Sequence, residues 1–233
     1  MTLNVNEATD VIERAVANGQ HALSEHDSKQ FIAAYGVPVN EEELVGDVAG
    51  ALEAAGRLGY PVAIKACSPA LMHKSDQGLV ALNVDDRSSV ERAMAEIGRA
   101  AGDAALDGYL VQPMVHGKRE AIVGGLRDKL FGPCVMLGLG GILVEAVADV
   151  SFRLAPIEER DALEMVREIR AQRLFGAVRG EEAVDRAALT QVLMAMGRIL
   201  CDHPQVSQVD VNPLIFAGSR PVAVDALVTL DAA

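Results

Sequence analysis

The sequence predicts an α+β protein built from two lobes of mixed α/β structure. Segments with apolar residues three and four positions apart are interspersed with short apolar runs typical of strands along the whole chain. The pattern changes near residue 110, where alternating helices and strands give way to a meander of strands. We therefore expect one domain over residues 22–233, with a smaller lobe at 36–110 and a larger lobe at 111–233. Helices within residues 1–35 are expected to pack on the larger lobe.

The expected elements follow from hydrophobic spacing. Helical spacing occurs over residues 5–18, 26–35, 47–58, 88–101, 157–170 and 185–201. Strand-like runs occupy residues 60–66, 78–84, 108–114, 120–125, 133–138, 151–156, 207–216 and 220–227. Ser24 and Ser28 give start signals for the second helix, and Gly36 followed by Pro38 gives its stop.

Composition restricts the location and the class of ligand. The N-terminus has neither a basic start nor an apolar run, and the longest apolar stretch, 131–144, is broken by glycines and too short for a bilayer. Three scattered cysteines fit a reducing compartment better than a disulfide framework or a zinc site. These features predict a cytoplasmic protein that does not enter a membrane.

The net charge of -12 argues against a nucleic-acid partner, which needs a basic stripe. Aromatic residues make up only 3% of the chain and Trp is absent, so stacking platforms for single strands are not expected. A polyphosphate ligand would have to be held by a few local cations, by backbone amides or by a metal ion.

The end of the chain predicts a metal site on a hairpin. If residues 217–220 form the loop, Phe216 pairs with Pro221, and the register then places Asn212 opposite Asp225, with Asp210 on the same face. Opposed residues lie close enough for one ion to take oxygen atoms from both, and this donor set suits Mg²⁺.

A plainer interpretation makes the same three side chains the solvent face of an amphipathic hairpin. Val209 and Val211, which point the other way, agree with both interpretations. Pro213 inside the strand indicates an edge strand or a bulge.

Two further features suggest a nucleotide site. Lys65 lies in an apolar strand, where a buried ammonium needs an anion such as phosphate, unless it is a lysine that protects an edge strand. The connection from Gln112 to Glu120 passes between the lobes, where backbone groups suit adenine and a carboxylate suits ribose hydroxyls. Taken singly, both residues are ordinary surface positions.

The glycine-dense stretch 137–145 matches neither a P-loop nor a dinucleotide-binding pattern. Its glycines still indicate a close approach of the backbone, either to a ligand or to adjacent strands.

The segment MHKSDQG contains His73, the one nucleophile at neutral pH among these residues. An imidazole can accept a phosphoryl group and pass it on. Lys74, Ser75 and the amides leading to Gly78 are placed to hold phosphate oxygens. The alternative is a histidine that only shapes a turn.

Taken together, these motifs resemble a known family. VAIKACSPALMHKSDQGLVALNV, the long run from YLVQPM to FRLAP, QVDVNPL and the opening LSEHDSKQFIAAYGVPV are similar to the ATP-grasp (β) subunit of ADP-forming (NDP-forming) acyl-CoA synthetases, relatives of succinyl-CoA synthetase. The resemblance covers about residues 22–230.

The resemblance implies an ATP-grasp fold with ATP or ADP held between the two lobes. It implies roles for residues on the phosphates (Lys65), at the adenine hinge (Gln112, Met114, Val115), on the ribose (Glu120) and on Mg²⁺ (Asn212, Asp225). Asp210 would orient a histidine during phosphoryl transfer, and His73 would take the phosphoryl group within this subunit.

The family interconverts acyl-CoA, ADP and phosphate with acid, CoA and ATP through an acyl phosphate and a phosphohistidine. The resemblance therefore implies a hetero-oligomer with a CoA-binding α-type subunit that carries a phosphorylatable histidine. Leu79 stands where a second glycine is common, and Lys129 where proline is common. The alternatives are a stand-alone ATP-grasp ligase joining a carboxylate to an amine, and a nucleotide-binding regulatory subunit without turnover.

Overall fold

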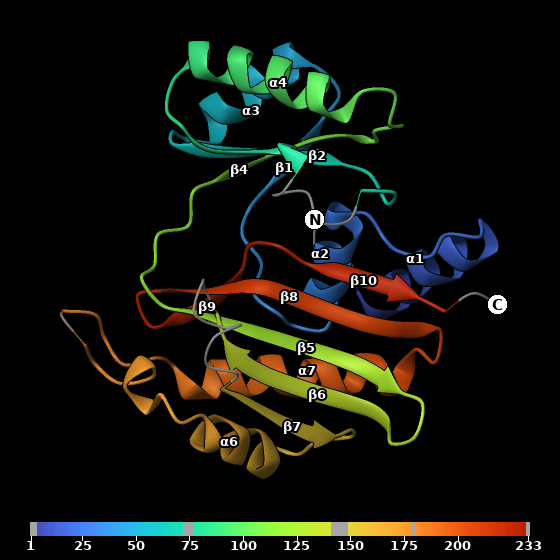
Figure 1. The fold of residues 1–233 in the computed structure, drawn as a ribbon, viewed down its shortest axis with the longest axis vertical. Coiled ribbons are helices and arrows are strands. Elements are labelled where there is room, and N and C mark those ends of the chain that lie inside the picture. The colour runs from blue at the N-terminus through green and yellow to red at the C-terminus, as the bar shows by residue number, and fades with distance from the viewer. Residues whose placement is uncertain (1–3, 72–76, 141–148, 179, 232–233) are drawn as a thin grey trace. The chain divides into compact units, whose positions relative to one another are not determined.

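A computed structural model describes residues 4–71, 77–140, 149–178 and 180–231. These residues form six α-helices and ten strands in two antiparallel sheets, which confirms the mixed α+β class (Figure 1). The chain divides into two compact units. Unit 1 comprises residues 1–23, 27–39 and 116–233, and unit 2 comprises residues 24–26 and 40–115.

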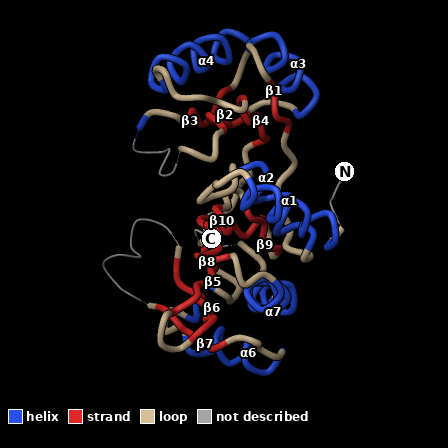
Figure 2. The backbone as a smooth tube through the Cα atoms, turned by 90° about the vertical axis from the view of Figure 1, so that its right-hand side faces the viewer, coloured by secondary structure: helices blue, strands red, loops and turns tan. Residues whose placement is uncertain are grey.

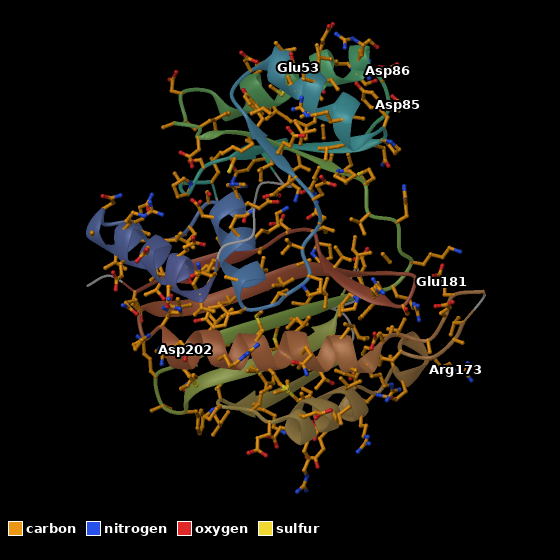
Figure 3. All side chains as sticks on the ribbon, turned by 180° about the vertical axis from the view of Figure 1, so that it is seen from behind. Glu53, Asp85, Asp86, Arg173, Glu181 and Asp202 are labelled. Carbon is orange, nitrogen blue, oxygen red and sulfur yellow. The ribbon has the colours of Figure 1, made fainter. Side chains whose placement is uncertain are left out.

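Unit 2 is a four-stranded sheet covered by two helices. Its sheet has the order β1-β4-β2-β3, and α3 and α4 pack against it. The elements are β1 (Glu43–Val45), α3 (Val48–Leu58), β2 (Val62–Cys67), β3 (Val80–Val84), α4 (Arg87–Ala101) and β4 (Gly108–Pro113). Asp47 and Asp86 cap the two helices by accepting backbone N–H groups of the first turn, and Figure 3 labels Asp86 at the start of α4.

Unit 1 is a six-stranded sheet with helices against one face. Five strands have the order β10-β8-β5-β6-β7, and β9 also pairs with β8. The strands are β5 (Glu120–Asp128), β6 (Gly132–Leu139), β7 (Val150–Leu154), β8 (Val206–Ala217), β9 (Arg220–Ala223) and β10 (Leu227–Leu230). The helices are α1 (Val5–Ala17), α2 (Glu25–Ala34), of which the part from Asp27 belongs to this unit, α6 (Glu159–Glu168) and α7 (Arg186–Asp202), with a short 3-10 turn at Gln172–Leu174.

Helix α7 forms the centre of the unit 1 core. It packs on β5, β6 and β8, and Figure 2 shows it beside one face of these strands. Its buried side chains include Leu193, Met196 and Leu200, which join Val209 and Val211 of β8 in one apolar cluster. The opposite face of the sheet is therefore available for a site.

Helix α2 is fastened to the end of α7 by a small polar cluster. The Tyr35 hydroxyl lies 2.8 Å from Nε2 of His203 and donates to Oδ2 of Asp202 at 3.1 Å. Figure 3 labels Asp202 at this end of the helix. Burial raises the pKa of Tyr35 and lowers the pKa of His203, because both charged forms lose solvation there.

The structure matches the expected elements with two differences. β1 was not predicted, because three residues are too few to show a periodic pattern. The expected strand at 220–227 ends at Ala223 as β9, and β10 begins only at Leu227 and continues to Leu230, beyond the expected range. Over the described residues, none of the helices has both the length and the apolar character that crossing a membrane requires.

Candidate nucleotide and metal site

The predicted register of the C-terminal hairpin is confirmed. Phe216 pairs with Pro221, and the ladder extends from Ala217 opposite Arg220 to Leu214 opposite Ala223. The loop is shorter than expected, because pairing at Ala217 leaves only residues 218 and 219 in the turn.

The same register continues beyond the break between β9 and β10. Leu227 pairs with Asp210 and Val228 with Val209. The two residue numbers of each pair add up to the same value as in the first ladder, so the register is unchanged. In the gap, the N–H of Val224 donates to the carbonyl of Pro213 at 3.4 Å, again in this register. Asp225 therefore lies across from Asn212, as the sequence predicts.

Pro213 marks a bulge inside the sheet. β8 is an interior strand, since β5 pairs along one side and β9 and β10 along the other. The β5 register shifts by one residue between Ala121 and Val123, where the partner residues are Leu214 and Val211. Of the two expectations for Pro213, the bulge is correct and the edge strand is wrong.

Three oxygen-bearing side chains share the face of the sheet away from α7. Val209 and Val211 are buried in the core, whereas Asp210 is half-buried and Asn212 is exposed on the opposite face. Asp225 is also half-buried. Two carboxylates and one amide oxygen are the hard donors that Mg²⁺ takes, with water and phosphate in its other positions, so these residues fit the ion. Within the described ranges, no group of three or more His, Cys, Asp or Glu side chains is placed to hold a metal by itself.

The segment that carries Asp225 is held by the N-terminal part of the chain. The N–H of Ala223 donates to the carbonyl of Pro38 at 2.8 Å, and the N–H of Val228 donates to Oγ of Ser28 at 3.1 Å. Between them, the ammonium of Lys29 lies 3.5 Å from the carbonyl oxygen of Val224.

Lys29 is fully buried and was missed by the sequence analysis. A signal was present, because Glu25, Ser28 and Lys29 precede Ile32 at the seven-, four- and three-residue spacings of one helix face. All four side chains are buried. Of the polar residues of this face, only Ser28 was interpreted, as a start signal of the helix.

Lys65 is buried and paired within unit 2. Its ammonium lies 2.6 Å from Oε1 of Glu25, and the two side chains are 6% and 2% exposed. β2 lies between β4 and β3, so the interpretation of Lys65 as an edge-strand lysine is wrong. The expected anion is present as a carboxylate, and Glu25 is a second residue that the sequence analysis did not assign.

The predicted hinge residues lie at the end of β4 and the start of β5. Gln112 is buried and pairs with Ala63 of β2, and the N–H of Met114 donates to the carbonyl of Pro61 at 3.0 Å. Met114 and Val115 are half-buried in unit 2. Glu120 is half-buried at the first position of β5 in unit 1.

Arg119, next to Glu120, is a buried residue without an assigned role. Its guanidinium donates to the backbone carbonyls of Leu174 (3.2 Å), Gly176 (2.9 Å), Glu182 (2.7 Å) and Gly218 (2.9 Å). One side chain therefore fixes the start of β5 against two distant loops. Sequence alone gives no signal for such a set of acceptors.

Two glycines at the end of β6, one in the strand and one just after it, are explained by close packing of strands. A Cβ atom on Gly140 would lie 2.6 Å from Cβ of Glu120, and one on Gly138 would lie 3.0 Å from Cγ1 of Val150. At these two positions the interpretation as tight packing of strands is correct. The remaining part of the motif, from residue 141, lies outside the described residues.

His73, Lys74 and Ser75 also lie outside the described residues, so their predicted roles stay predictions. Gly78 has a φ of +71°, which favours glycine, and Leu79 after it is buried in the unit 2 core. The leucine that replaces the family's second glycine is therefore an anchor for the start of β3.

Comparisons with known proteins identify the family. An ATP-grasp domain model matches residues 14–230. The β subunit of acetate–CoA ligase (ADP-forming) I from Pyrococcus furiosus is 39% identical over 97% of this chain and 99% of its own length. Acetate–CoA ligase (ADP-forming) I from Archaeoglobus fulgidus is 40% identical over 94% of this chain but only 32% of its own length.

A solved structure agrees in fold. A chain of the Ca. Korarchaeum cryptofilum dinucleotide-forming acetyl-coenzyme A synthetase 1, in complex with coenzyme A and Ca-AMPCP, has a TM-score of 0.91 at 38% identity, covering 96% of this chain and all of that one. The same synthetase with Mg-AMPPCP has a phosphohistidine segment pointing towards the nucleotide-binding site. The chain described here belongs to the ATP-grasp family, among the ATP-grasp β subunits of the ADP-forming acyl-CoA synthetases.

Proposed function

We propose that this chain is the nucleotide-binding subunit of an ADP-forming acyl-CoA ligase, an acid–thiol ligase. Together with a CoA-binding partner, it interconverts acyl-CoA, ADP and phosphate with acid, CoA and ATP. The observation that carries the proposal is the match to the Pyrococcus furiosus β subunit along nearly the full length of both chains. The oxygen donors on β8 support it independently.

Unit 2 supplies the phosphate and adenine contacts in this proposal. Lys65 turns from Glu25 to the phosphates, where a cation offsets the charge of the nucleotide. The N–H of Met114 is already bonded to Pro61, so the adenine contacts come from the Met114 carbonyl and the backbone of Val115. Gln112 supports this hinge from β4.

The loop before β3 supplies further phosphate contacts. Ser75 and the backbone at Gly78 hold phosphate oxygens, and His73 takes the phosphoryl group within this subunit. Glu120 of unit 1 accepts hydrogen bonds from the ribose hydroxyls.

The face of β8, with the segment between β9 and β10, supplies the metal ligands and a positioning carboxylate. Asn212 and Asp225 hold Mg²⁺, which when bound neutralises charge on the transferring phosphoryl oxygens. Asp210 accepts a hydrogen bond from the imidazole of a histidine delivered by the partner, and so orients the ring for transfer. The partner is an α-type subunit, and the assembly is a hetero-oligomer.

The metal ligands can be tested on the isolated chain. Asp225→Asn and Asn212→Ala should each weaken Mg-ATP binding by about tenfold or more in calorimetric titrations, because the first removes the negative charge of a ligand and the second removes an oxygen donor. Gln208→Ala is a matched control, since Gln208 is exposed and two residues from Asp210 on the same face of β8. Binding that is equal in all three variants would remove these residues from the metal site.

The reaction can be tested by adding a candidate CoA-binding polypeptide. Acyl-CoA, ADP and phosphate should yield ATP only when both polypeptides are present. Labelling with γ-³²P ATP should mark the wild-type chain, and His73→Ala should lose the label while still binding nucleotide. Turnover by the isolated chain with an amine acceptor would support a stand-alone ligase instead. Mg-ATP binding without labelling or turnover, with the partner supplied, would support a regulatory subunit.

A further inference from the structure

Large apolar side chains are exposed together on one part of unit 1. They include Phe131, Phe152 and Leu154, which are 70%, 49% and 56% exposed, and Leu126 and Val150 are also exposed. We call these five residues the β6–β7 apolar surface. Single exposed apolar residues are normal, but a contiguous exposed group marks a contact site.

The strand registers place these residues on one face. Leu126 pairs with Cys134, and Cys134 pairs with Leu154, so the three side chains form one row across β5, β6 and β7. Phe131, in the turn between β5 and β6, and Phe152, in the next row, also line a cavity of about 330 Å³ beside this row. The surface is therefore hollowed rather than flat.

A second row connects this surface to the candidate catalytic carboxylate. Phe152 pairs with Met136, Met136 with Gly124, and Gly124 with Asp210. A Cβ atom on Gly124 would lie 3.8 Å from Cε of Met136 and 3.9 Å from Oδ1 of Asp210, which puts both side chains on the same face. Adjacent strands lie about 4.8 Å apart, so three spacings place Phe152 roughly 14 Å from Asp210.

We propose that the β6–β7 apolar surface is the docking site of the CoA-binding partner subunit, an inference that rests on the proposed function. The Archaeoglobus fulgidus relative contains a region like this chain as 32% of its length, so about two thirds of that polypeptide must be accommodated around such a domain. A body seated on β6 and β7 would stand beside Asp210 on the face that a delivered histidine must reach.

The border of the surface has the polarity of an interface rim. Arg153 lines the cavity beside Leu154, and its guanidinium lies 2.6 Å from Oε1 of Glu168 on α6. Asp128 borders the other side. An apolar centre with a charged rim is the usual anatomy of a specific protein contact.

The test uses two charge insertions and a matched control. Phe152→Asp and Leu154→Asp should each weaken binding of the partner more than about tenfold, because a buried interface anchor is replaced by a desolvated charge. Leu82→Asp should bind within about twofold of wild type, since Leu82 is equally exposed (58%) but lies on β3 of unit 2. The partner is the CoA-binding polypeptide that restores ADP-forming activity to the wild-type chain, and affinity is measured by biolayer interferometry.

Folding and location have their own readouts. Mg-ATP binding by the isolated variants should equal that of wild type, because none of the three positions is in the nucleotide site. Alkylation provides a footprint within the natural sequence, since Cys134 lines the cavity and Cys201 is exposed on α7, against the other face of the sheet. Adding the partner should protect Cys134 and leave Cys201 reactive.

The outcomes separate this inference from the proposed function. If no CoA-binding polypeptide binds or activates the wild-type chain, the proposed function fails, and the docking site with it. If the wild-type complex is active and both aspartate variants bind equally well, the docking site alone is wrong. It is also wrong if the isolated chain dimerises in sedimentation experiments and Phe152→Asp abolishes that dimer.

Discussion

Breaking the buried pair between Lys65 and Glu25 should destabilise the protein strongly. In Lys65→Met the methionine keeps most of the apolar stem but leaves the Glu25 carboxylate, 2% exposed, without the ammonium at 2.6 Å. Loss of one partner of a buried ion pair costs about 3–5 kcal/mol. That is a large share of the roughly 5–15 kcal/mol that stabilises a typical domain.

The effect can be measured by urea unfolding followed by circular dichroism, because the chain has no Trp for fluorescence. A loss of about 4 kcal/mol, with a slope of about 2 kcal/mol per M, lowers the midpoint by about 2 M. Arg57→Met is a matched control that breaks the exposed pair with Glu43, whose side chains are 57% and 32% exposed. It should move the midpoint far less, because water screens that pair.

A double variant separates the structural role of Lys65 from its proposed role on the phosphates. Glu25→Leu with Lys65→Met replaces both charges by apolar groups of similar size, which should recover most of the lost stability. Mg-ATP binding should be lost both in Lys65→Met and in the double variant, because neither has the ammonium for the phosphates. A single variant as stable as wild type would refute the reasoning about the buried pair, and a double variant that binds Mg-ATP normally would refute the role on the phosphates.

Three further predictions concern packing, pH and a buried guanidinium. Gly140→Ala should lower the free energy of unfolding by about 1–3 kcal/mol in thermal unfolding, since its Cβ would lie 2.6 Å from the neighbouring strand. The control is Gly56→Ala in α3, which has open space around it and should be neutral or stabilising. Burial lowers the pKa of His203 from 6.5, so the contribution of this residue to stability is complete above pH 6.5 and is lost as the pH falls below that value. His203→Gln should therefore flatten the acid part of a plot of stability against pH. An unchanged slope would contradict this. Arg119→Lys should cost at least about 1–3 kcal/mol, because one ammonium cannot serve four carbonyls in different segments, and a Tm equal to that of wild type would contradict the structural role.

The sequence was informative where a pattern repeats over several residues. The six helices and most strands follow from apolar spacing, and the hairpin register follows from the length of one turn. The three residues of β1 carry too little pattern to be recognised. The break between β9 and β10 was also unpredicted. It lies across from the part of β8 that bulges against β5, a strand about ninety residues away in sequence.

The candidate site was predicted where its residues share one strand or one hairpin. Asp210, Asn212 and Asp225 follow from the alternation of side chains along paired strands. Glu25 and Lys29 were missed because helical periodicity indicates which face of a helix is buried but not which residues of other segments contact that face. Their partners, Lys65 and Val224, lie 40 and 195 residues away in sequence.

The common register of β9 and β10 on β8 limits how this hairpin can change in evolution. The chain between Ala223 and Asp225 must have a fixed number of residues, because a deletion of one would put every later residue on the wrong side of the sheet. Asp225 would then point towards α7 instead of sharing a face with Asn212. Homologous hairpins that keep both residues should therefore vary in the turn at 218 and 219 but not in the number of residues between the first ladder and Asp225.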